Sequence, residues 1–128
     1  ISYVLSESND NTLVYKTFDK AVKATLDAHP RFHSDRGFQY TSRAFHQKLV
    51  QAGMTQSMSR VAHCIDNGPM EGFWGILKRE RYYGRRFTSK QELVEMIVRY
   101  IHYYNTRRVQ RSLGMLTQME KHVLCLAA

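Results

Sequence analysis

The sequence predicts an α/β fold that contains parallel strands. Segments typical of strands alternate with segments of helical spacing along the 128 residues, and this alternation is characteristic of α/β layers. Hydrophobic residues make up 43% of the chain and charged residues 23%, which indicates a globular protein of about one domain. Three predicted strands are few for such a sheet, so the predicted architecture is incomplete.

The predicted elements follow the apolar spacing and the residues that begin or end helices. Short β-branched, aromatic or apolar runs predict strands over 1–5, 31–34 and 54–58. Helical spacing of apolar residues predicts helices over 12–28, 42–52, 69–83 and 89–106. Pro30, Ser42, Pro69 and Ser89 stand where these helices should end or begin. We expect one partial domain over 1–122 and a tail over 123–128.

The positive charge is concentrated in one part of the chain. The formal net charge is +8, and residues 78–111 hold ten Lys or Arg against three Glu. Several of these cations are paired or stand beside tyrosine, as in the segment 81–86. Clustered cations that neutralise phosphates indicate a nucleic-acid partner, whereas a solvated helix face is the plainer alternative.

Cysteine usage and hydropathy exclude several classes of protein. Cys64 and Cys125 form no CxxC pair, so neither a disulfide scaffold nor a zinc site is expected, although His63 adjoins Cys64. The apolar runs are too short for a membrane span. We therefore expect a soluble cytoplasmic protein that makes no use of a membrane.

Two carboxylates stand where metal-dependent chemistry is commonly placed. Asp35 directly follows a predicted strand, and Glu71 lies in the first turn of a predicted helix. Carboxylate oxygens suit Mg²⁺ or Mn²⁺, and such ions can activate and stabilise the oxygens of a phosphodiester. Lys78 lies seven residues after Glu71 on the same helix face, where it could contact a nucleic acid.

Each of these residues also has a simpler interpretation. Asp35 precedes Arg36 and Gly37, and Asp-Arg-Gly is good turn chemistry. Glu71 could merely complete a helix cap, and Lys78 alone would be a surface lysine. The combination, rather than any single residue, indicates a site.

Five segments closely resemble one protein family. They are HSDRGFQYTS at 33–42, SMSR at 57–60, DNGPMEGFWGILKRE at 66–80, YYNTRR at 103–108 and SLG at 112–114. They resemble the catalytic core of bacterial insertion-sequence transposases, which belong to the retroviral-integrase-like superfamily with a DDE active site. Family members have 35 residues between the second Asp and the Glu, as Asp35 and Glu71 do (36–70).

The resemblance implies a ribonuclease-H-like fold and an enzyme that cuts transposon ends and joins them to target DNA. Asp35 and Glu71 would be the second and third members of a catalytic triad that binds Mg²⁺ or Mn²⁺. The partners would be transposon-end and target DNA, in a bacterial cytoplasm where DNA-bound protein lies at the nucleoid. Apolar surface left exposed by the incomplete sheet also predicts assembly with further copies of the chain. The implied or candidate DNA contacts are Lys78, Arg36, Arg60, Arg107 and Arg108.

The chain also departs from the family pattern. The first catalytic Asp is expected on a hydrophobic strand well before Asp35, and no upstream carboxylate has that setting. Residues 1–5 match the third strand of the family sheet, so we expect an N-terminally truncated core that lacks the first two strands and is inactive alone. Two alternatives stay open: a catalytically dead DNA-binding or partner-binding remnant, and a metal-dependent nuclease of the same fold.

Overall fold

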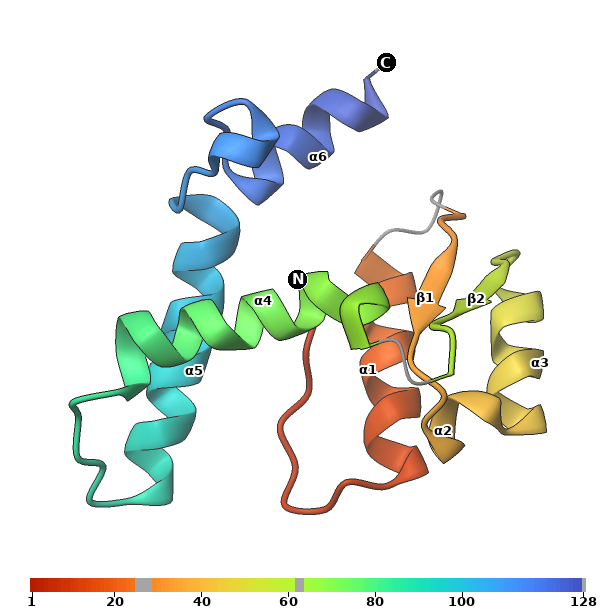
Figure 1. Cartoon of the computed structure of the whole chain (residues 1–128), viewed down its shortest axis with the longest axis horizontal. Helices are drawn as coiled ribbons and strands as arrows, with labels where there is room; N and C mark the ends of the chain where they lie inside the picture. Colours follow the sequence, from red (N-terminus) through yellow and green to blue (C-terminus); the bar gives the residue numbers. More distant parts are fainter. Residues whose placement is uncertain (25–28, 62–63, 128) are drawn as a thin grey trace. The chain divides into compact units, whose positions relative to one another are not determined.

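The chain forms two compact units. The computed structural model describes residues 1–24, 29–61 and 64–127. One unit is Ser2–Phe73, and the other is Trp74–Ala128 together with Ile1. Helix α4 (Gly68–Leu77) runs through the boundary between them, which is why no linker marks that boundary in the sequence. Figure 1 labels the α-helices and β-strands of both units.

The first unit is built around two parallel strands. Its elements are α1 (Asn11–Ala24), β1 (Phe32–Ser34), α2 (Phe38–Thr41), α3 (Arg43–Gln51), β2 (Gln56–Met58), the 3-10 helix η1 (Cys64–Asn67) and the start of α4. Strands β1 and β2 lie side by side (Figure 1), and His33 is paired with Ser57 at the centre of the register. This pair confirms the predicted parallel strands.

Phe45 is the centre of the core of this unit. Its side chain is fully buried, and Phe18 from α1 and Leu49 from α3 are buried with it. The rings of Phe18 and Phe32 meet the Phe45 ring edge-on, with centroids 5.4 and 5.2 Å away. Edge-to-face aromatic pairs add to the free energy gained from burial. The core therefore fixes α1 and α3 against the sheet that carries Asp35.

The N-terminal segment differs from its prediction. Residues 1–5 were predicted to be a strand, but residues 1–6 have no regular secondary structure. A strand is stable only when its backbone groups pair with a neighbour, and within the described residues β1 and β2 pair only with each other. The segment is held through side chains instead, since Lys20 Nζ lies over the Tyr3 ring and donates to the Tyr3 carbonyl at 3.0 Å.

Two predicted helices of this unit have different bounds. The helix predicted over 12–28 is α1, which the structure describes from Asn11 to Ala24; residues 25–28 lie outside the described residues, as does His63. The helix predicted from Ser42 is α3, and Ser42 Oγ accepts from the Phe45 amide at 3.2 Å as its cap. The short helix α2 precedes it and was not predicted.

The second unit is helical. It contains the end of α4, the π-helix η2 (Lys78–Tyr82), α5 (Lys90–Thr106), the 3-10 helix η3 (Arg111–Leu113) and α6 (Gln118–Leu126). Its buried side chains include Tyr100, Ile101 and Tyr104 of α5. No helix among the described residues is long and apolar enough to cross a membrane.

The structure differs from the prediction at both ends of this unit. One α-helix was predicted over 69–83, but after Leu77 the backbone widens into a π turn in which the Tyr83 amide donates to the Lys78 carbonyl at 2.8 Å. A tail was expected over 123–128, but α6 continues to Leu126. Thr117 and Glu120 form a capping box that begins α6, so its first amides are satisfied.

Candidate active site

Asp35 stands directly after β1 in a tight turn. Its Oδ1 accepts a hydrogen bond from the Gly37 amide at 2.9 Å. A side chain at position 37 would not fit easily, because a Cβ there would lie 3.0 Å from Asp35 Oδ1. Asp35, Arg36 and Gly37 thus form the turn that their sequence predicted, and this turn also orients the Asp35 carboxylate. The side chain is exposed, and Oδ2 makes no hydrogen bond with a described residue.

The two strand ends are tied together beside Asp35. The Ser59 amide donates to the Ser34 carbonyl at 2.9 Å, which extends the parallel pairing past the strands. Arg36 Nε donates to the Ser59 carbonyl at 3.0 Å. Both serines are buried, so these backbone groups depend on each other for their hydrogen bonds. Arg36, a predicted DNA contact, therefore also fixes the loop that carries Asp35.

Arg60, another predicted DNA contact, is held by Asp66. Arg60 Nε and Nη2 donate to the two Asp66 carboxylate oxygens, each at 3.0 Å, and the Arg60 amide donates to Asp66 Oδ2 at 3.0 Å. The side-chain hydrogen bonding to Asp66 raises the pKa of the Arg60 guanidinium. Asp66 was not predicted to have a role, although it begins the DNGPME segment that carries Glu71.

Glu71 lies in the first turn of α4 and is exposed. It belongs to the same compact unit as Asp35. Among the described residues, no group of three or more His, Cys, Asp or Glu side chains is placed to hold a metal ion. Within the part of the chain that the structure describes, Asp35 and Glu71 are therefore not gathered with a third such side chain.

The predicted basic residues of the second unit fall into two groups. Lys78, the first residue of η2, and Arg107, the C-cap of α5, are exposed and have no side-chain hydrogen bond or ion pair with the residues described. Arg108 differs, because its Nη2 donates to Glu80 Oε1 at 2.8 Å and its guanidinium lies over the Tyr104 ring.

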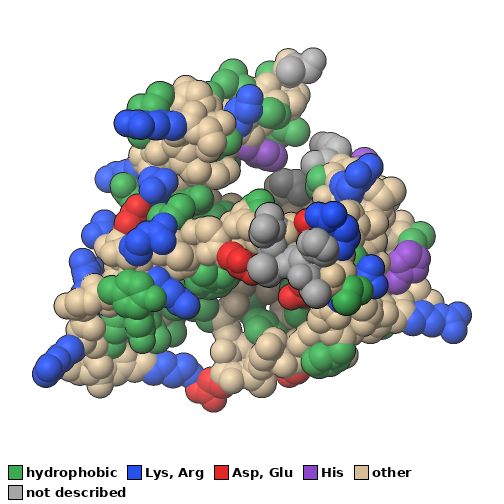
Figure 2. All heavy atoms as spheres, in the orientation of Figure 1, with side chains coloured by type: hydrophobic (Ala, Val, Ile, Leu, Met, Phe, Trp, Pro, Cys, Tyr) green, Lys and Arg blue, Asp and Glu red, His purple; other side chains and the backbone are tan. Residues whose placement is uncertain are grey.

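Glu80 joins η2 to α5 and to the segment after it. Its Oε2 accepts from the Tyr100 hydroxyl at 2.9 Å, while Arg108 donates to Oε1. The hydrogen bond from Arg108 lowers the pKa of the Glu80 carboxyl, and burial with the Glu80 hydrogen bond raises the pKa of Tyr100. This network lies two residues after Lys78. On the face drawn in Figure 2, Lys and Arg side chains are more numerous than Asp and Glu.

Two forms of the integrase core domain match this chain, one over residues 1–64 and the other over residues 52–117. Each match covers half of the chain or more. The chain belongs to the integrase core domain family. This membership confirms the resemblance found in the sequence and implies the ribonuclease-H-like fold, of which the structure shows an α/β part with a small parallel sheet.

Several relatives of this integrase core carry names of transposases. The chain is 41% identical over 121 residues to the protein assigned as transposase InsK of insertion sequence element IS150 in Escherichia coli K12, which covers 94% of the chain and 43% of that protein. It is 41% identical to a transposase-like protein of Haemophilus influenzae, over 91% of the chain and 54% of the relative. A transposase for insertion sequence element IS904 of Lactococcus lactis is 35% identical, over 88% of the chain and 46% of that relative.

The integrase core chain spans about half the length of these curated relatives. Their names favour a transposase and give no support to a DNA-binding remnant without chemistry. Integrase cores generally depend on a metal ion, and the donor set here suits a hard cation. Asp35 and Glu71 offer exposed carboxylate oxygens, which leave coordination positions for water and substrate phosphate.

Proposed function

We propose that this chain is part of the catalytic core of an insertion-sequence transposase, an enzyme that cuts transposon ends and joins them to target DNA. Asp35 and Glu71 bind Mg²⁺ or Mn²⁺ as two members of its catalytic triad. The observation that carries the proposal is the placement of both carboxylates. Asp35 follows a strand of the parallel sheet and Glu71 begins a helix of the same unit, in a chain of the integrase core family.

The chain's own residues prepare the site in three ways. The Gly37 amide holds one oxygen of Asp35 and leaves the other for coordination. Arg36 and Arg60 position the loops after β1 and β2 through Ser59 and Asp66. Bound divalent ions would then activate the attacking oxygen and stabilise the leaving oxygen of the phosphodiester.

Lys78 is the strongest candidate for the contact to transposon-end DNA. It is exposed, it follows the last residue of the helix that carries Glu71, and it has no side-chain partner among the residues described. Arg107 is free in the same sense, whereas Arg36, Arg60 and Arg108 are engaged within the protein. An exposed cation without an internal partner can bind phosphate without first breaking an ion pair, so its binding costs the least free energy.

The site of this chain needs a third carboxylate. We propose that the first Asp of the triad and the first two strands of the core lie outside this chain, in line with the part of its relatives that it spans. The chain alone therefore does not join DNA strands. Its exposed apolar side chains, among them Phe38, Val61 and Leu126, support assembly with further copies in the working enzyme.

A chimera tests this function. The chain replaces the matching 121 residues of the Escherichia coli relative, and transposition of a marked element is scored in cells. We expect transposition that is lost at least a hundredfold with Asp35→Asn or Glu71→Gln and kept with Asp19→Asn, a control at a half-exposed carboxylate of α1. Transposition that survives both site variants would contradict the proposal, and cleavage without strand joining would favour a nuclease.

A further inference from the structure

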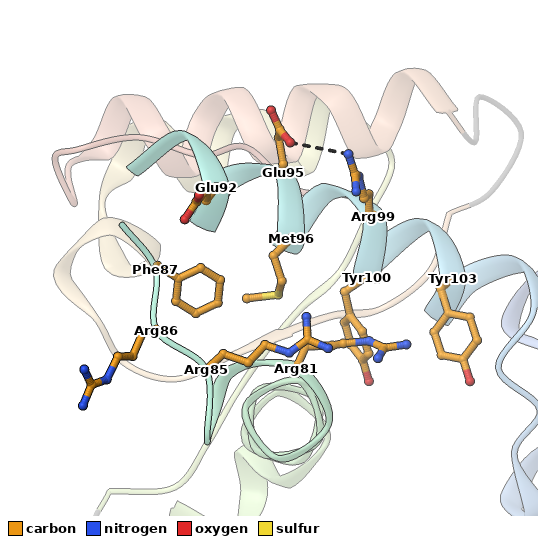
Figure 3. A pocket seen from close by; sticks show the side chains of 10 residues that line it. All are labelled: Arg81, Arg85, Arg86, Phe87, Glu92, Glu95, Met96, Arg99, Tyr100 and Tyr103. Atoms are coloured by element: carbon orange, nitrogen blue, oxygen red, sulfur yellow. Dashed lines mark hydrogen bonds and ion pairs between the residues drawn. The ribbon is translucent and has the colours of Figure 1, made fainter. Parts of the chain in front are cut away.

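The second unit contains an open pocket that is separate in sequence from Asp35 and Glu71. Its volume is about 620 Å³, and it is formed by η2, the segment after it and α5. Ligand pockets typically span roughly 300–1,000 Å³, which is enough for a single nucleotide but not for a duplex. Figure 3 shows that Arg81 and Arg85 extend along one side of the pocket while Arg86 points away from Phe87.

The charge of this pocket favours an anion. Four arginines and two glutamates line it. Both glutamates are already engaged, since Glu92 accepts from the Thr88 amide at 2.8 Å and Glu95 accepts from Arg99 at 3.5 Å and from Gln91. Arg85 has no side-chain partner among the described residues. With four arginines against two glutamates, and with one glutamate paired to Arg99, the lining keeps an excess of positive charge.

The floor of the pocket is apolar and aromatic. The Phe87 ring and the Met96 side chain face each other in Figure 3. The Phe87 ring is also stacked on Tyr82, with centroids 5.7 Å apart and an angle of 19° between the planes. At the far end, the Arg81 guanidinium lies over the Tyr103 ring, 5.8 Å from its centroid. A held aromatic ring beside guanidinium groups is the combination that binds unpaired bases together with their phosphates.

We propose that this pocket binds an unpaired nucleotide of a DNA strand. Arg85 and Arg81 contact its phosphate, and its base lies against Phe87 and Met96. The ligand is an unpaired nucleotide because the faces of paired bases are covered by stacking and cannot reach a ring inside a pocket. The assignment of DNA as the source rests on the proposed function, in which transposon ends are cut and joined to target DNA; the binding chemistry itself needs no metal ion.

Fluorescence anisotropy of a fluorescein-labelled ten-nucleotide oligo-dT, measured in EDTA, tests the proposal. Phe87→Leu keeps an apolar side chain and removes the ring, so we expect binding about tenfold weaker. Arg85→Gln should lower the slope of log K against log salt by about 0.7, the value for one phosphate contact on a single strand. The matched controls are Phe38→Leu, at an exposed ring outside the pocket, and Arg111→Gln, at a cation outside the pocket. Both should bind like the unaltered chain.

The proposal is overturned if Phe87→Leu and Arg85→Gln bind like their controls. If Phe87→Leu fails to fold, as judged by circular dichroism, Arg85→Gln at its exposed position decides alone. A duplex that competes as well as oligo-dT would refute the unpaired ligand. Better competition by oligo-rU would refute DNA, and equal competition by free dTMP would refute a strand. Because EDTA removes divalent ions, this assay does not depend on the metal site. A negative result here would leave the proposal for Asp35 and Glu71 standing, and a negative result for that site would leave this one standing.

Discussion

Replacing Glu80 by Gln should lower the free energy of unfolding of the Trp74–Ala128 unit by about 1–2 kcal/mol. The carboxylate accepts charge-assisted hydrogen bonds from Arg108 and a further one from Tyr100. Hydrogen bonds to charged groups contribute roughly 1.5–3 kcal/mol each when well buried. The side chains of Arg108 and Glu80 are 23% and 35% exposed, so solvent screening reduces that value. The amide of Gln also retains one acceptor.

The same network predicts how this contribution changes with pH. The pKa of Glu80 is lowered in the folded chain, first by the Arg108 hydrogen bond. A lowered folded-state pKa means that the stabilisation is complete above the unfolded value of about 4.3 and is lost as the pH falls through the lower value. The unaltered chain and Glu80→Gln should therefore differ at pH 7 and converge in acid.

Urea unfolding followed by tryptophan fluorescence measures this effect, because Trp74 is the single tryptophan of the chain and lies in this unit. Glu95→Gln is the matched control. The side chain of its partner Arg99 is 82% exposed and lies 3.5 Å away. Loss of this ion pair should therefore lower the free energy of unfolding by less than about 0.5 kcal/mol. Equal midpoints for the two variants at pH 7, or a difference that persists in acid, would refute the reasoning.

Three further substitutions test the fold, each by thermal or urea unfolding followed by circular dichroism. Phe45→Ala removes a fully buried ring from the first core and should lower the free energy of unfolding by about 3–5 kcal/mol; a loss below 1 kcal/mol would contradict that core. Gly53→Ala should cost about 1–2 kcal/mol, because φ is +66° and the new Cβ would lie 2.8 Å from His29 Nδ1. Its control Gly72→Ala has open space in helix α4 and should raise stability by roughly 0.5–1 kcal/mol. Thr117→Ala removes the cap of α6 and should cost about 1 kcal/mol, and unchanged helicity and stability would argue against the cap.

The sequence predicted the elements whose signals are local. The caps at Ser42 and Ser89, the strand before Asp35 and the helix that begins near Pro69 all depend on residues close in the chain. The bounds of α5 differ from the predicted helix by a single residue at its start. The parallel pairing of β1 and β2 also followed from the alternation of strands and helices.

What could not be predicted depends on partners distant in the sequence. The segment 1–5 has strand composition, but a strand forms only beside a neighbour, and composition does not show whether one is present. The π turn at η2 places Glu80 against Arg108, 28 residues later, and no local pattern encodes that pair. The ion pair between Arg60 and Asp66, which are six residues apart, was also missed, because Arg60 was interpreted only as a candidate DNA contact.

The sequence predicted where the two candidate carboxylates lie relative to the secondary structure. Asp35 and Glu71 stand at the strand end and the helix start where the sequence placed them. Their role as metal ligands stays a proposal. Within the residues described, no third His, Cys, Asp or Glu side chain joins them in a group that could hold a metal ion.

Mn²⁺ binding followed by electron paramagnetic resonance tests the central claim most directly. We expect the chain to bind one Mn²⁺ weakly, Asp35→Asn and Glu71→Gln each to weaken binding at least tenfold, and Glu95→Gln to leave it unchanged. Mn²⁺ binding that is the same in all four proteins, or that is lost equally with Glu95→Gln, would contradict a metal site at Asp35 and Glu71.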